Sequence, residues 1–102
     1  MPIVVKEIQI NDGTTFPEIL YGSATLNFAS TLANAVRTLT VSVPGAQVGD
    51  VVELGIPPEA MPADGGYRAW VSAADTVSIR FWNNGSVSRD PGSGTFNVMV
   101  LK

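Results

Sequence analysis

The chain has 102 residues, of which 45% are hydrophobic and 15% are charged, and its formal net charge is −3. This length suits a single domain, and the composition is too apolar and too weakly charged for intrinsic disorder. The sequence contains neither cysteine nor histidine. Disulfides, thiol nucleophiles, histidine-based catalytic triads and conventional zinc sites are therefore excluded.

Alternation of apolar and polar residues predicts a series of strands with one buried face each, because successive side chains of a strand point to opposite sides. In chain order, the predicted strands cover residues 4–10, 24–28, 38–43, 52–56, 69–71, 76–82 and 95–100. In the segment 76–82, for example, Val77, Ile79 and Phe81 form the apolar face.

Turn-forming residues separate these segments: Asn11-Asp12-Gly13, Pro44-Gly45, Gly49-Asp50, Asn83-Asn84-Gly85 and Asp90-Pro91-Gly92. Residues 28–36 are expected to be a loop, and the prolines from Pro57 to Pro62 permit only a short helical turn. Short strands at this spacing indicate an all-β fold. The sequence predicts a single-domain antiparallel β-sandwich over residues 22–102, with either a jelly-roll or an immunoglobulin-like topology. Residues 1–21 are expected to form an N-terminal arm or edge strand.

The charged residues give little indication of a ligand. The lysines and arginines are scattered and form no basic stripe, so we expect no nucleic-acid partner: Lys6, Arg37, Arg68, Arg80, Arg89 and Lys102. No apolar run approaches the roughly 20 residues of a membrane-spanning helix, and the first residues lack the features of a signal peptide. We therefore expect no membrane partner and synthesis in the cytoplasm.

Catalysis by this chain would have to use carboxylates, hydroxyls or lysine. The obvious option is a carboxylate pair that hydrolyses sugars, with four candidates: Asp50, Glu53, Asp75 and Asp90. Asp50 and Asp90 lie in predicted turns, Asp75 at a strand entrance and Glu53 on the polar side of a strand. These positions favour turn and solvent-facing roles. The loops also lack the spacing of a calcium-binding loop. The sequence predicts a non-enzymatic protein with no catalytic residue, metal or cofactor.

Several large apolar residues fall on the polar side of their predicted strands, namely Trp70, Trp82, Met99 and Leu101. They cap the core at irregular strand ends, or they belong to a subunit interface, where aromatic residues and methionine are enriched. With the apolar residues of the N-terminal segment, they give a set of candidate interface residues: Ile3, Val5, Ile8, Ile19, Tyr21, Trp70, Trp82 and Met99.

Several short segments follow one another in a recognisable order: Gly22–Phe28, Leu39–Val41, Gly45-Ala46 with Val48-Gly49-Asp50, Ala69–Val77, Asn83, and Asp90-Pro91 before Thr95–Val98. In this order, the region from Gly22 to Lys102 resembles a small β-sandwich module of tailed-phage virion proteins. Such modules are capsid decoration (cement) proteins or end domains of fibres. The resemblance implies a non-enzymatic role and commonly a homotrimer.

The resemblance and the small size lead us to expect a structural virion protein on the capsid surface, with the major capsid protein and its own copies as partners. Such a cement protein bridges subunits of the assembled shell and stabilises that state by mass action. The segment 1–21 is expected to dock by strand addition. The alternative is a receptor- or glycan-binding module of a phage tail or head fibre. In that case Tyr67, Trp70 and Trp82 stack on sugars, while Asn83 and Asn84 form hydrogen bonds.

Overall fold

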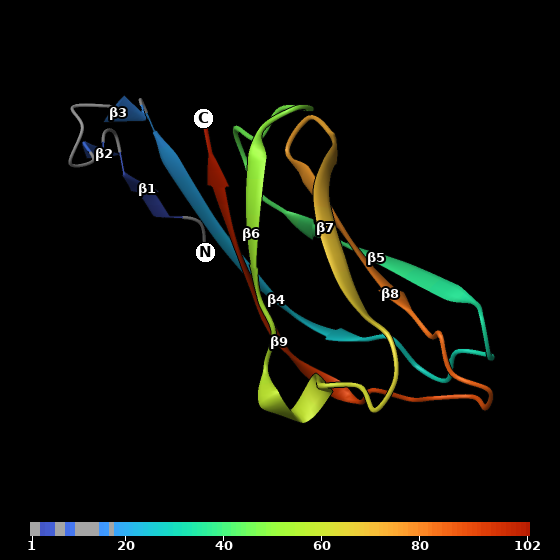
Figure 1. Ribbon diagram of the computed structural model, residues 1–102. Coiled ribbons are helices and arrows are strands. Elements are labelled where there is room, and N and C mark those ends of the chain that lie inside the picture. Colours follow the sequence, from blue (N-terminus) through green and yellow to red (C-terminus); the bar gives the residue numbers. More distant parts are fainter. Residues whose placement is uncertain (1–2, 6–7, 10–14, 17) are drawn as a thin grey trace.

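The structure is a computed structural model that describes residues 3–5, 8–9, 15–16 and 18–102 (Figure 1). For the first three of these ranges it describes the backbone only. The described residues form strands and one short 3₁₀ turn: β1 (Ile3–Val5), β2 (Ile8–Gln9), β3 (Thr15–Phe16), β4 (Ile19–Asn27), β5 (Val36–Ser42), β6 (Val51–Gly55), η1 (Pro58–Ala60), β7 (Gly66–Ala73), β8 (Thr76–Trp82) and β9 (Ser93–Leu101).

Two antiparallel sheets pack face to face, one with the strand order β1-β4-β9-β6 and the other with the order β5-β8-β7 (Figure 1). The short strands β2 and β3 pair with each other. At one rim of the molecule β6 and β7, the last strands of their sheets, run side by side. The predicted all-β sandwich is confirmed.

The chain passes repeatedly between the two sheets. From β4 to β7 it crosses to the other sheet at each connection, and it crosses again between β8 and β9. Jelly-roll and immunoglobulin-like sandwiches differ in how the chain winds between the sheets. The sequence left these two topologies open, because strand order depends on pairing between distant segments.

Each sheet contributes alternate side chains to one continuous core. On β8 the predicted apolar face is confirmed, since Val77, Ile79 and Phe81 are fully buried. The facing strand β9 buries Phe96, Val98 and Val100 in the same alternating manner. Gly22 of β4 lies opposite Val98 of β9. A Cβ atom at position 22 would lie 2.9 Å from the Val43 side chain. A glycine at this position therefore lets the backbone of β4 approach the other sheet.

Tyr67 lies at the centre of an aromatic cluster at one end of the core. Its ring centre lies 5.3 Å from that of Phe28, 5.4 Å from Phe81 and 5.1 Å from Phe96. The hydroxyl donates a hydrogen bond to the carbonyl oxygen of Ala60, at 2.7 Å. Burial raises the pKa of Tyr67 to about 12. The ring thus joins η1 to both sheets.

The observed strand bounds agree with the predicted ones best for β8 and differ most for β4. The predicted strand 24–28 begins at Ile19 in the structure, because all nine residues of β4 pair with the nine of β9. The expected division between residues 21 and 22 therefore falls inside a strand. The loop over residues 28–36 contains a single bridge, Thr31 to Arg89, before β5 begins at Val36. The short turn expected between Pro57 and Pro62 is η1.

Candidate interface on the outer face of the β1-β4-β9-β6 sheet

The outer face of this sheet carries a row of apolar side chains where a solvent-exposed sheet would carry polar ones. The register places Leu101 of β9 between Ile19 of β4 and Val51 of β6. Ile19 is 6% exposed, Leu101 is half-buried and Val51 is 58% exposed. This row extends across three neighbouring strands.

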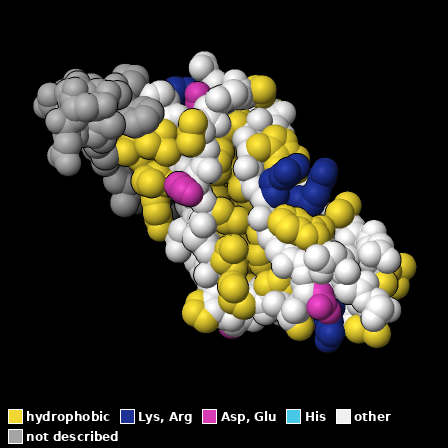
Figure 2. Space-filling model, viewed as in Figure 1, with side chains coloured by type: hydrophobic (Ala, Val, Ile, Leu, Met, Phe, Trp, Pro, Cys, Tyr) yellow, Lys and Arg dark blue, Asp and Glu magenta, His cyan; other side chains and the backbone are white. Residues whose placement is uncertain are grey.

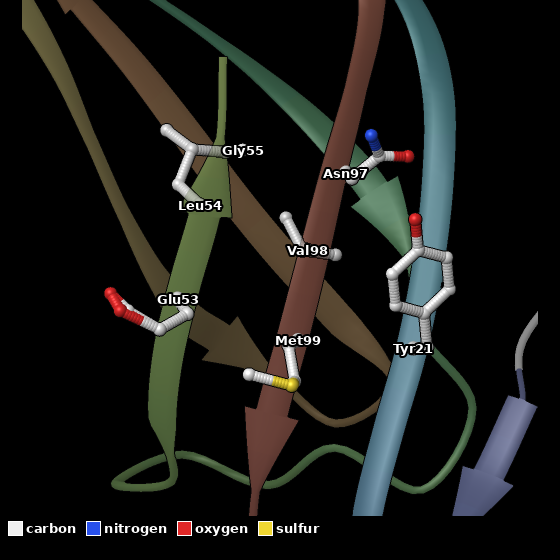
Figure 3. Close-up of a pocket in the computed structure, with 7 residues that line it drawn as sticks. All are labelled: Tyr21, Glu53, Leu54, Gly55, Asn97, Val98 and Met99. Carbon is white, nitrogen blue, oxygen red and sulfur yellow. The ribbon is translucent and has the colours of Figure 1, made fainter.

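A second row lies beside the first. Here Met99 of β9 lies between Tyr21 of β4 and Glu53 of β6. Tyr21 and Met99 are half-buried, and Glu53 is exposed. These residues help to form a shallow cavity of about 240 Å³. Figure 3 shows the Met99 side chain reaching toward β6, while the Glu53 carboxylate points away from β9. The cavity is lined by Tyr21, Glu53, Leu54, Gly55, Asn97, Val98 and Met99.

We call Ile19, Tyr21, Val51, Met99 and Leu101 the outer apolar face. Three of the five are candidate interface residues from the sequence, and the register brings these three together. Leu101 was noted in the sequence for its position on the polar side of its strand. Val51 was missed, although the consecutive Val51 and Val52 place an apolar side chain on each side of β6. Of these five, Val51 is exposed, Tyr21, Met99 and Leu101 are partly exposed, and Ile19 is buried. Grouped apolar side chains that keep surface area are typical of protein interfaces.

The two tryptophans lie on the opposite side of the molecule, on the outer face of the β5-β8-β7 sheet. Trp70 of β7 is half-buried, and the guanidinium carbon of Arg80 lies 4.9 Å from its ring centre. Trp82 of β8 is 38% exposed and its ring covers Gly66, where a Cβ atom would lie 3.1 Å from the indole. The structure therefore does not bring the tryptophans together with Tyr21 and Met99.

The remaining candidates lie in the N-terminal segment. Ile3 and Val5 of β1 pair with Tyr21 and Ile19, so β1 extends the sheet beside the outer apolar face. Ile8 of β2 pairs with Phe16 of β3. The side chains of Ile3, Val5 and Ile8 lie outside what the structure describes, as do residues 1–2, 6–7, 10–14 and 17 of the expected arm and the turn predicted at 11–13.

Asp50 has a structural role near the C-terminus. Its carboxylate accepts hydrogen bonds from the backbone N–H of Gln47, at 2.9 Å, and from the Lys102 ammonium, at 3.0 Å. Burial acts to raise the pKa of Asp50, but these two donors outweigh it and hold the pKa below its ordinary value. The carboxylate therefore remains ionised and joins the last residue to the turn before β6.

The other three acidic candidates have equally local surroundings. Asp75 accepts a hydrogen bond from the backbone N–H of Gly45, at 2.7 Å, and Asp90 from that of Gly92, at 3.0 Å. Glu53 is exposed on β6. The predicted turn and solvent-facing roles of the four carboxylates are confirmed.

Two residues of the glycan-binding alternative have partners within the fold. Tyr67 belongs to the aromatic cluster of the core. Asn83 is 1% exposed, and its amide nitrogen donates to the carbonyl oxygens of Thr31, Leu32 and Val87. The buried Asn83 is therefore not accessible to a sugar, whereas Tyr67 is half-buried with its ring packed against the core.

Two further features are missing from the described part of the chain. It contains no helix long and apolar enough to cross a membrane. Nor does it contain a group of three or more acidic side chains placed to hold a metal ion. Comparison of the chain with protein-family models, with curated proteins and with solved structures found no match.

Proposed function

We propose that the chain is a structural virion protein, a capsid decoration (cement) protein that binds the assembled shell of a tailed phage and bridges its subunits. The ordered segments that resemble such modules support this function, and so does the β-sandwich fold. The observation that carries the proposal is the outer apolar face, which offers a partner a contiguous apolar surface on three strands.

The outer apolar face has the chemistry of a docking surface for the major capsid protein. Covering apolar side chains stabilises a complex by roughly 25 cal/mol for each Å² removed from water. Val51 and the half-buried Tyr21, Met99 and Leu101 retain such area in the single chain. β1 continues the same sheet at its other edge, and an edge strand can pair with a strand of a neighbouring protein. The outer apolar face and the edge strand β1 together form the proposed contact with the shell.

The energetic effect of such a protein follows from which state it binds. A protein that binds the assembled shell, but not the separate subunits, stabilises the shell by mass action. A homotrimer presents three copies of the outer apolar face, so after the first contact the others form at high effective concentration. Weak individual contacts then suffice for full occupancy of the shell.

The test is the copy number of the chain relative to the major capsid protein in purified virions, by quantitative mass spectrometry. We expect a ratio near one or a simple fraction of it. In the double variant V51S/M99Q, which removes apolar area from the outer apolar face, we expect the affinity for the shell to fall by about tenfold or more. The copy number should fall with it.

The matched control is V48S/V87S, which shortens two valines that are 70% and 51% exposed and lie outside the outer apolar face. This variant should be incorporated like the original chain. Unchanged incorporation of V51S/M99Q would exclude the outer apolar face as the contact. A ratio far below one would instead place the chain on a tail or fibre and favour the receptor-binding alternative, and absence from virions would contradict both.

A further inference from the structure

A second surface feature lies on the outer face of the β5-β8-β7 sheet, away from the outer apolar face. β7 and β8 place Arg68 directly opposite Arg80. With Ala69 and Trp70 these two residues line a cleft of about 410 Å³, which we call the arginine cleft. Figure 2 shows basic side chains gathered over β7, next to hydrophobic atoms. In a chain of net charge −3, this is a local concentration of positive charge.

The guanidinium of Arg80 is held in place from two sides. Its central carbon lies 4.9 Å from the centre of the Trp70 ring, a cation–π arrangement. Its Nε donates a hydrogen bond to the hydroxyl oxygen of Thr38 on β5, at 3.1 Å. The terminal nitrogens therefore project from a fixed position, so that little side-chain entropy remains to be lost when a ligand binds.

The positive charge of the cleft has no counterpart within the described part of the chain. Salt bridges there join Arg89 to Asp64 and Lys102 to Asp50, and neither Arg68 nor Arg80 takes part in one. The other outward positions of the three strands are neutral: Val36, Thr38, Thr40, Ser42, Gly66, Ser72, Thr76, Ser78 and Trp82. Like charges directly opposite each other on neighbouring strands destabilise a sheet. An arrangement that costs stability in the free chain is explained by a ligand that neutralises it.

We propose that the arginine cleft binds carboxylates of an acidic, extended segment of a partner protein. Arginine offers a planar set of N–H donors that matches a carboxylate, and two such groups lie side by side here. Alternate side chains of an extended segment point to the same side, so a segment that lies over the cleft can present a carboxylate to each guanidinium.

A sugar ligand fits the arginine cleft less well than a peptide. Sugars bind to aromatic residues by stacking on an open ring face, whereas the guanidinium of Arg80 covers a face of Trp70. The cleft therefore offers mainly charged N–H donors. This inference concerns the chemistry of a partner and holds whether or not the chain decorates a phage shell.

The test uses the full chain with the substitution Trp82→Phe, which leaves Trp70 as the one tryptophan. The probe is a hexapeptide of alternating glutamate and valine, and the control peptide has glutamine in place of glutamate. At low salt, where charges are least screened, we expect the glutamate peptide to change the Trp70 fluorescence in a saturable manner. The glutamine peptide should have no such effect.

The double variant R68Q/R80Q should lose about tenfold or more of this affinity, whereas R37Q should bind like the parent chain. Arg37 is the matched control, because it is an exposed arginine on another strand whose Nε donates to the Ser30 carbonyl oxygen.

Four results would overturn the inference. One is the absence of a saturable response, and another is an equal response in R68Q/R80Q. A third is an equal change of the Trp70 fluorescence with inorganic phosphate at the same ionic strength, or with an acidic oligosaccharide in place of the peptide. Either result would make the cleft a site for a different ligand. The fourth is failure of R68Q/R80Q to fold, which would make the two arginines structural residues.

Discussion

Tyr67 is the residue whose role differs most from its expected one. We considered it as a surface aromatic, but it occupies the centre of the aromatic cluster and donates to the carbonyl oxygen of Ala60. The sequence does contain the relevant signal, since Tyr67 is in phase with Ala69 and Val71 on the core side of β7. Extending the predicted strand 69–71 by three residues toward the N-terminus, to the observed start at Gly66, would have placed Tyr67 on the core side.

The raised pKa of Tyr67 predicts a specific pH dependence. In the folded chain the phenol ionises at about 12, compared with 10.0 ordinarily. The unfolded chain therefore loses this proton first, so that stability is fully present below pH 10 and falls as the pH rises toward 12. We expect Tyr67→Phe to be about 1 kcal/mol less stable at neutral pH, because the hydrogen bond is lost.

Above pH 10 the difference between Tyr67→Phe and the original chain should shrink and then reverse, because phenylalanine does not ionise. Urea unfolding of both chains, at neutral pH and on either side of pH 10, measures this difference. A difference that is the same at all pH values would show that the phenol is not protected in the folded chain.

At the scale of elements, the turn between β7 and β8 is bound to the connection between β5 and β6. Asp75 has a positive φ of 61°. Its backbone N–H donates to the carbonyl oxygen of Ala46, at 2.9 Å, and its own carbonyl accepts from Val43, at 2.9 Å. Its carboxylate accepts from Gly45, at 2.7 Å. Asp75 thus joins the β7–β8 hairpin to the connection that leads from β5 to β6 in the other sheet.

Asp75→Ala should destabilise the chain by about 2 kcal/mol. About half of this comes from placing alanine at a positive φ, and the other half from losing the hydrogen bond to Gly45. Asp75→Asn should retain most of the stability, because asparagine tolerates this conformation and keeps an acceptor oxygen. Urea unfolding measures both variants, and equal losses would show that neither backbone conformation nor acceptor matters here.

At the scale of the whole molecule, Asn83 joins the loops at one end of the sandwich. Its side-chain nitrogen donates to the carbonyl oxygens of Thr31, Leu32 and Val87, and its side-chain oxygen accepts from Gly85. These partners belong to the β4–β5 and β8–β9 connections, both of which cross between sheets. The buried amide therefore joins both crossings, together with the backbone bridge between Thr31 and Arg89.

Asn83→Ala should lower the free energy of unfolding by about 3 kcal/mol, because it removes a buried side chain together with its hydrogen bonds to both connections. The exposed neighbour Asn84 provides the control, and Asn84→Ala should change stability by less than about 0.5 kcal/mol. Chemical denaturation followed by tryptophan fluorescence measures both variants. Similar values for the two would contradict the role of Asn83 in closing this end.

The sequence by itself determined the fold class, the turns and the excluded chemistry, because these depend on local properties of the chain. The period of two predicted the all-β class and the inner side of β8, with Val77, Ile79 and Phe81 in the core. Turn-forming residues predicted the turns, because a residue such as Asp90 satisfies a backbone donor two positions away. The missing residue types excluded thiol and imidazole chemistry without any structure.

Only the tertiary structure decided which of these local pieces lie together. The pairing of β4 with β9 brings Tyr21 next to Met99, and the pairing of β7 with β8 places Arg68 opposite Arg80. The same packing encloses Asn83. Strand order and register arise from hydrogen bonds and core packing between segments that are distant in the chain. A local pattern cannot specify them, because alternation shows which side of a strand is buried but not which strand lies beside it.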